Sequence, residues 1–250
     1  MSSTARPRTS ASDDGPTSRI VRPQNAILAK LPAAELAAIM EEAEEISLTL
    51  RQKLFQPRDT LHSVYFPLTG MISLVILLQD GTTIEAMTVG KEGFVGLPLV
   101  NGVKTARYGG MCQVAGDFLV LNSDAFMRVL GKTPDLTRRL YLYSQFAQEM
   151  VAQSAACNSV HVLEARCARW LLLSADAVGR TTFAITQEFL SQMLAVRRPG
   201  VTVAIGALVK RSLVLSEYGR ITILDVEGLK RAACECYATI RGKAYELLES

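Results

Sequence analysis

The hydrophobic pattern changes its period along the N-terminal half of the chain. Between residues 23 and 48, apolar residues recur at the three- and four-residue steps of an amphipathic helix, and Pro32 divides this stretch into two short helices. From about residue 48 to 121, short β-branched and aromatic runs replace that spacing, and Asp80-Gly81 separates two of them. Because Asp-Gly between apolar runs is typical of a β-hairpin, we expect a small antiparallel sandwich or barrel here.

The helical period returns after Ser123 and continues without proline or glycine from residue 135 to 160. A helix of about 25 residues spans roughly 37 Å, which is long enough to be the spine of a dimer. Steps of three and four, as in a coiled coil, predict a dimer seam that ends near His161. The predicted seam residues are Leu140, Tyr143, Ala147, Met150, Ser154 and Cys157. The alternative is a core helix of a single chain.

Residues 185–209 are apolar except where Arg197-Arg198-Pro199-Gly200 interrupts them. Proline inside a helix removes a hydrogen bond, so one continuous helix is excluded and two helices with a turn are predicted. Thr186 is a good N-cap for the first helix, and Pro199 fits the first turn of the second. The second helix is then expected to bury Val201, Ile205 and Leu208.

Two helices with this turn form a helix-turn-helix, whose second helix places its N-terminal end in the DNA major groove. Residues 212–225 are predicted to form two short strands around Tyr218-Gly219, which would make the domain winged. Positive charge is concentrated here, with six basic residues against two acidic ones between Arg180 and Arg220. The alternative is a helical hairpin that packs on its own protein.

Four stretches carry a resemblance to a known family: "VYFPLTGMISLV", "VGKEGFVGLP", "EARCARWLLL" and "ITQEFLSQMLAVRRPGVTVAI". With the order of the parts, they resemble the Crp/Fnr family of bacterial transcription regulators over about residues 25–225. The resemblance implies an α+β fold with a cyclic-nucleotide-binding-like jelly roll (β-roll), a long dimerisation helix and a winged helix-turn-helix. The expected divisions are a disordered tail at 1–22, the β-roll at 23–133, the central helix at 134–161, and the DNA-binding domain with a C-terminal helical extension at 162–250.

The predicted DNA-binding set is Thr186, Gln187, Arg197, Arg198, Thr202, Lys210 and Arg220. The resemblance assigns Thr186 and Gln187 to phosphate contact and Arg198 to base reading. Two departures indicate an operator different from that of the best-known members. Pro199 stands where those members have a glutamate that reads cytosine, and Val203 stands where a second basic residue is common.

The predicted effector pocket consists of Phe94, Gly96, Leu97, Lys104 and Arg107. Leu97 follows Gly96 where members that bind cAMP have the glutamate for the ribose, and Tyr108 follows Arg107 where they have serine or threonine. Cyclic-nucleotide binding is therefore disfavoured. Lys104 or Arg107 could hold another anion, and the alternative is an ordinary solvated surface charge.

The five cysteines do not predict a disulfide framework, and no metal site or cofactor is expected. Cys234-Glu-Cys236 lacks a second pair at the usual ligand spacing, and the two histidines, His62 and His161, are interpreted as ordinary structural residues. Cys157 is expected to be a small buried residue, with redox bridging across the dimer seam as the alternative. No set of side chains suits catalysis, so an enzyme is not expected.

No apolar run is long enough to cross a bilayer, and the N-terminus has no signal-peptide pattern, so the expected location is the cytoplasm. We predict a homodimeric transcription regulator on an inverted-repeat operator, responding to an effector other than cAMP. Its expected partners are double-stranded DNA, a second copy and an unidentified small molecule, with RNA polymerase as a further candidate. The alternative is a ligand-binding or scaffold module with vestigial DNA binding, which Gly200 and the apolar remainder of the second helix favour.

Overall fold

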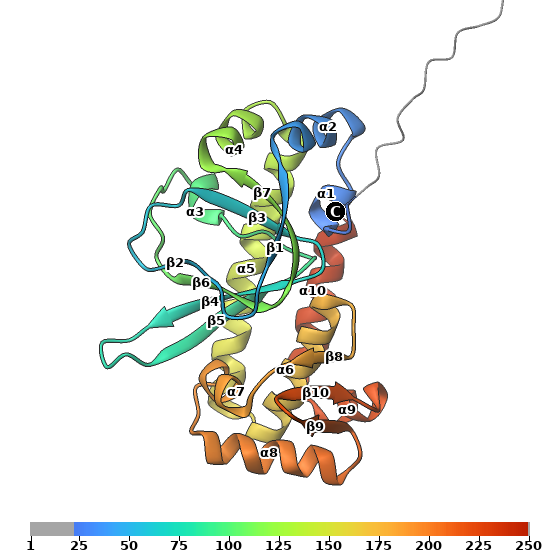
Figure 1. Ribbon diagram of the computed structural model, residues 1–250. Coiled ribbons are helices and arrows are strands. Elements are labelled where there is room, and N and C mark those ends of the chain that lie inside the picture. Colours follow the sequence, from blue (N-terminus) through green and yellow to red (C-terminus); the bar gives the residue numbers. More distant parts are fainter. Residues whose placement is uncertain (1–22, 250) are drawn as a thin grey trace, which may run out of the picture.

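A computed structural model describes residues 23–249; the predicted tail at 1–22 lies outside the described residues. The N-terminal half is a roll of two antiparallel sheets (Figure 1). One sheet has the order β1-β7-β3 and the other the order β2-β6-β4-β5. Their bounds are β1 Glu44–Leu48, β2 Lys53–Phe55, β3 Ser63–Pro67, β4 Met71–Leu77, β5 Thr83–Val89, β6 Gly109–Val114 and β7 Gly116–Asn122. The predicted α+β class and β-roll are confirmed.

Four short helices close the roll: α1 Ala26–Ala29, α2 Ala33–Glu42, α3 Leu97–Val100 and α4 Ser123–Leu130. The predicted division at Pro32 lies between α1 and α2. The hairpin at Asp80-Gly81 joins β4 to β5, and Gly81 has a φ of +84°, which favours glycine. Inside the roll, the ring of Phe94 lies 4.8 Å from that of Phe66 and 5.4 Å from that of Phe126, so aromatic packing fixes the core.

The long helix α5, Pro134–Val160, runs from the β-roll to the C-terminal domain. Its predicted seam faces the same chain instead of a second copy. Leu140, Tyr143, Ala147 and Met150 lie in the core that α5 shares with the β-roll. Ser154 is half-buried, and Cys157 faces Cys234. The expected seam is corrected here, because the β-roll covers most of that face of α5. The three-four spacing shows which residues share a helix face, but it does not show which element covers that face.

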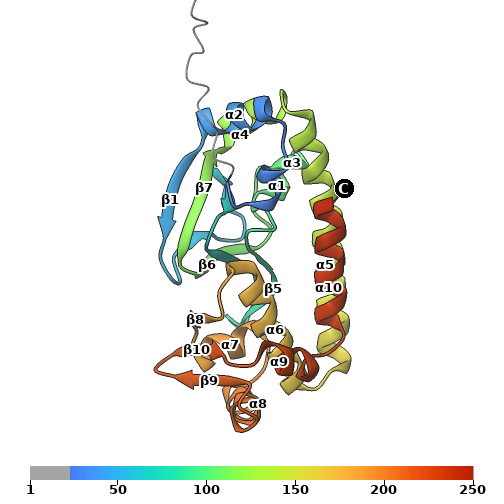
Figure 2. The same cartoon turned by 90° about the vertical axis from the view of Figure 1, so that its right-hand side faces the viewer.

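The last helix, α10, Cys236–Glu249, lies antiparallel along α5 (Figure 2). Lys243 Nζ pairs with Glu149 Oε2 at 2.7 Å, and Ile240 of α10 is buried in the β-roll core. The C-terminal extension thus covers part of α5 that would otherwise be exposed.

The core of the C-terminal domain surrounds Trp170 and Leu171 and continues into the β-roll through Met71, Val75 and Val114. It contains a three-stranded sheet of order β8-β10-β9. Its elements are α6 Leu163–Val178, β8 Thr182–Ala184, α7 Gln187–Met193, α8 Arg198–Lys210, β9 Val214–Glu217, β10 Arg220–Ile223 and α9 Val226–Ala232. None of the described helices has the length and apolar character needed to cross a lipid bilayer.

Candidate nucleic-acid interface and effector pocket

Helices α7 and α8 form the predicted helix-turn-helix. Thr186 is the N-cap of α7, and its Oγ1 accepts a hydrogen bond of 3.1 Å from the Phe189 amide. The turn contains Ala195 at a φ of +53°, and the buried Arg166 donates to the Leu194 carbonyl at 2.5 Å. A buried guanidinium of α6 therefore holds the start of the turn between the two helices.

Helix α8 begins as its sequence predicts, with Arg197 as the N-cap residue and Pro199 in the first turn. Val201, Ile205 and Leu208 are at most 1% exposed, so this face anchors the helix in the domain. The opposite face, at the start of the helix, is open to solvent (Figure 1).

That open face carries the residues predicted to contact DNA. Arg197, Arg198 and Thr202 are all exposed. Thr202 Oγ1 donates to Gln187 Oε1 at 2.7 Å, so the first turns of α7 and α8 are joined at the surface. Val203, an apolar side chain on the same open face, is 74% exposed.

The wing is the two-residue hairpin between β9 and β10. Tyr218 and Gly219 both have positive φ, at +48° and +70°, as a type I′ turn requires. Tyr218 is fully exposed at the tip, and Arg220 follows it on the surface. Lys210 is exposed at the far end of α8. The predicted basic residues therefore lie at both ends of α8 and on the wing.

The β-roll contacts the helix-turn-helix directly through Arg51. Its Nη2 donates to Thr186 Oγ1 at 3.1 Å, and its guanidinium carbon lies 5.8 Å from the centre of the Phe189 ring. Arg51 therefore occupies the hydroxyl that was predicted to meet a DNA phosphate. No sequence signal identifies this contact, because the two residues are 135 positions apart.

A second contact between the two domains centres on Glu85 of β5. Trp170 Nε1 of α6 donates to Glu85 Oε1 at 2.9 Å, and Ser73 Oγ donates to Oε2 at 2.8 Å. Burial raises the pKa of Glu85 to about 7, against the hydrogen bonds from Ser73 and Trp170 and the positive charge of Arg169.

Stability is expected to fall as pH rises through the titration of Glu85. In the unfolded chain this carboxyl has a pKa near 4.5, so between pH 4.5 and about 7 the folded state binds more protons. Glu85→Gln should flatten the dependence of the melting temperature on pH between about pH 4.5 and pH 7. Thermal unfolding followed by circular dichroism tests this, and equal slopes for the variant and the wild type would contradict it.

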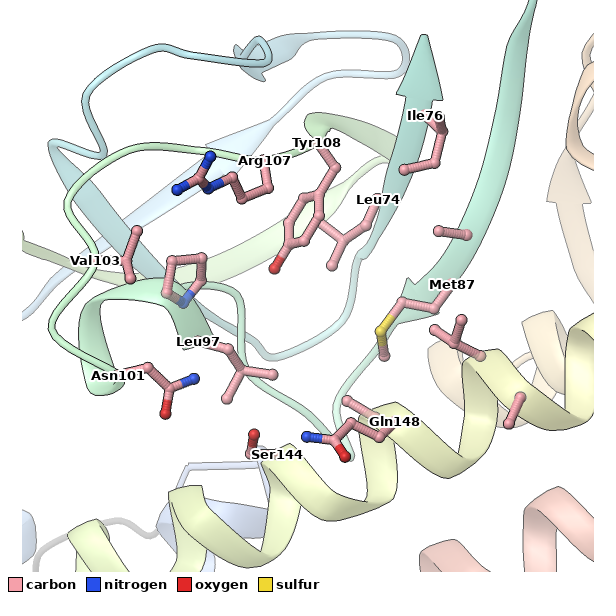
Figure 3. Close-up of a pocket in the computed structure, with 15 residues that line it drawn as sticks. Leu74, Ile76, Met87, Leu97, Asn101, Val103, Arg107, Tyr108, Ser144 and Gln148 are labelled. Atoms are coloured by element: carbon pink, nitrogen blue, oxygen red, sulfur yellow. The ribbon is translucent and has the colours of Figure 1, made fainter. Parts of the chain in front are cut away.

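A largely apolar cavity of about 650 Å³ lies between the β-roll and α5 (Figure 3). Tyr108 and Leu74 lie on one side, and Ser144 and Gln148 of α5 lie on the other. The lining residues are Leu74, Ile76, Ala86, Met87, Leu97, Pro98, Asn101, Val103, Arg107, Tyr108, Ser144, Ala147, Gln148, Val151 and Ala152.

Of the five residues predicted for the effector pocket, Leu97 and Arg107 line this cavity. Phe94 packs inside the roll, Gly96 lies against Val64 with a φ of +144°, and Lys104 is exposed outside the lining. The sequence reasoning missed the contribution of α5, because nothing in the chain before residue 134 shows where that helix crosses the roll.

The described chain thus consists of a β-roll, a long helix and a winged helix-turn-helix in that order (Figure 1). Residues 165–232 match the family model of the Crp-like helix-turn-helix domain, so the C-terminal part of the chain is similar to that domain. No curated protein matches the sequence.

Solved structures show the same fold over most of the chain. A CRP-family transcriptional regulator of Thermus thermophilus is 21% identical with a TM-score of 0.63, covering 75% of this chain and 96% of its own. FixK2 of Bradyrhizobium japonicum is 16% identical with a TM-score of 0.64, covering 77% and 98%. The c-di-GMP responsive regulator CLP of Xanthomonas campestris is 13% identical with a TM-score of 0.62, covering 77% and 99%. The matched domain and this fold together support a DNA-binding transcription regulator.

Proposed function

We propose that the protein is a homodimeric, sequence-specific regulator that binds an inverted-repeat operator. The observation that carries this is the exposed start of α8, where Arg197 and Arg198 stand beside the Gln187–Thr202 hydrogen bond. Arginine at this end of a recognition helix pairs with guanine in the major groove or with phosphate. The other two basic residues, Lys210 and Arg220, are exposed and are proposed to contact the DNA backbone.

The second copy is proposed to pack on the exposed face of α5. Tyr141 is 56% and Val151 is 41% exposed, and Ala152 and Ala155 extend the same face. Apolar and small residues at steps of three and four permit close packing of two helices. A two-fold dimer built on this face would present two α8 helices to two half-sites.

The β-roll is proposed to respond to a mainly apolar effector in the cavity between β4, β5 and α5, with Arg107 at the edge for an anionic group. A ligand in this cavity can shift the equilibrium between two orientations of the DNA-binding domain only if it binds the protein more tightly in one orientation than in the other. The contacts of Arg51 with Thr186 and of Trp170 with Glu85 are the ones such a shift would change.

Tight binding of cAMP or cGMP is not expected. Leu97 stands where the ribose carboxylate is needed, and the cavity wall is largely apolar. Isothermal titration calorimetry measures this directly. A dissociation constant below about 10 μM, equivalent to roughly −7 kcal/mol, would contradict this interpretation of the pocket.

A ligand-binding or scaffold module with vestigial DNA binding is the second candidate, because Val203 and Gly206 leave much of the exposed face of α8 without polar side chains. A band shift on the DNA upstream of the protein's own gene distinguishes the two. For a regulator, log affinity should fall linearly with log salt, because phosphate contacts release counterions. Absence of a retarded complex at low salt would favour the module.

RNA polymerase is the further partner that we propose for a regulator acting at promoters, and the cytoplasm is its proposed location. Both proposals depend on operator binding, and a protein that binds no operator would contradict both.

A further inference from the structure

Four potential metal ligands converge at the C-terminal end of α5. Cys157 Sγ, His161, Cys234 Sγ and Cys236 Sγ each offer one atom, and these atoms all lie within 4.8 Å of one another. The three thiols are buried and the imidazole is half-buried. We propose that these four side chains bind one tetrahedral zinc ion.

The spacing of the four atoms suits a single ion. With bonds of about 2.3 Å to sulfur and about 2.0 Å to nitrogen, a tetrahedral zinc separates its ligand atoms by roughly 3.5 to 3.8 Å. The Cys157 and Cys234 sulfurs lie 3.5 Å apart, and Cys236 Sγ lies 3.7 Å from His161 Nδ1. An iron–sulfur cluster would spread the ligands farther, because its four ligands are distributed over two or four irons. Three thiolates and one imidazole form one of the common structural zinc sets.

His161 is oriented as a zinc ligand needs to be. Its Nε2 lies 3.0 Å from Glu235 Oε2, and a carboxylate can only accept a hydrogen bond there, so Nε2 carries the proton. Nδ1, the atom that faces Cys236, is then left with a free lone pair. A carboxylate behind the imidazole is the usual outer partner of a histidine ligand to zinc.

The surroundings also suit the charge of such a centre. Three thiolates around Zn²⁺ leave a net charge of about −1. Arg169 is 5% exposed, its Nε has no hydrogen-bond partner among the described residues, and it lies close enough to act electrostatically on Cys157 and Cys234. Gln153 Nε2 lies 3.1 Å from Cys236 Sγ, where it would donate to a thiolate. A buried cation and a donor thus face an anionic centre.

The site joins two segments that are far apart in the chain. Cys157 and His161 stand one turn apart at the end of α5, while Cys234 and Cys236 lie between α9 and the start of α10. A zinc ion here would tie α10 to α5 next to the junction that leads into α6. The proposal rests on this ligand set alone and is independent of operator binding.

The test is the metal content of the full chain, produced in zinc-supplemented medium and purified without chelators. Inductively coupled plasma mass spectrometry is expected to find about one zinc per chain, as for a closed four-ligand site. Cys234→Ala and Cys236→Ala should each lose most of it. Cys112→Ala and Cys167→Ala are the matched controls, because each removes a buried cysteine outside the cluster and should leave the zinc content unchanged.

Cobalt provides a readout that does not depend on the variants. Co²⁺ added to zinc-stripped wild-type chain should give the intense visible bands of a tetrahedral site and a thiolate-to-cobalt charge-transfer band, and Zn²⁺ should remove both. Three results would overturn the proposal: wild-type chain that neither contains zinc nor takes up Co²⁺, iron with acid-labile sulfide in place of zinc, or a Cys157–Cys234 disulfide in freshly isolated protein.

Discussion

Replacing Arg198 with alanine is expected to weaken operator binding by about 1 to 3 kcal/mol, or roughly 5- to 150-fold, and to relax preference at one position in each half-site. Arg198 is exposed at the first residue of α8, the end of the recognition helix that enters the groove. The expected loss is that of the bidentate guanine contact proposed for this side chain. Competition binding with an operator and its single-base variants measures both effects.

Arg197→Ala is the matched control. Arg197 is the N-cap residue, one position outside the helix, and phosphate contact is the role proposed for it. Its removal should weaken binding to all sequences about equally and lower the salt slope by about one unit. If Arg198→Ala instead leaves affinity and sequence preference unchanged, the base-reading role is wrong.

Met150→Glu is expected to unfold the chain and not merely to separate a dimer. Met150 is 7% exposed in the core that α5 shares with the β-roll, and an unpaired carboxylate there costs several kcal/mol. That loss is comparable to the whole stability of an ordinary domain. Circular dichroism should show a greatly lowered melting temperature or no transition.

Val151→Glu, one position further on, separates folding from association. Val151 is 41% exposed on the face proposed for the second copy, so the charge should leave the melting temperature of the fold nearly unchanged. Light scattering should then show a monomer, and operator affinity should fall with it. A Val151→Glu protein that remains dimeric would show that the two copies meet elsewhere.

The helix-turn-helix could be predicted closely because its signals are local. The N-cap hydroxyl of Thr186 and the fixed φ of Pro199 act within one turn of helix, whatever the rest of the chain does. The partner of α5 could not be predicted in this way. Periodicity assigns Leu140 and Met150 to one face, but whether the β-roll or another copy covers that face depends on the tertiary fold.

The cysteine cluster lies between these two cases. Cys157 and His161 stand at positions i and i+4, a spacing that places two side chains on the same side of a helix. Together with Cys234 and Cys236 they are a Cys-His pair and a Cys-Cys pair, a signal that the requirement for two cysteine pairs does not detect. What the sequence does not contain is the antiparallel packing of α10 on α5, which brings pairs 77 positions apart into contact. The contacts of Arg51 and Glu85 with the DNA-binding domain are equally tertiary.

Selection from a random pool of double-stranded DNA with purified protein, with and without cell extract, tests the central claim most directly. The account predicts enrichment of an inverted repeat whose half-sites are centred about one helical turn apart, roughly 34 to 36 Å. It also predicts that Arg198→Ala protein selects a repeat that is degenerate at one position per half-site. A pool that shows no enriched motif under either condition would contradict the account and leave the helix-turn-helix vestigial.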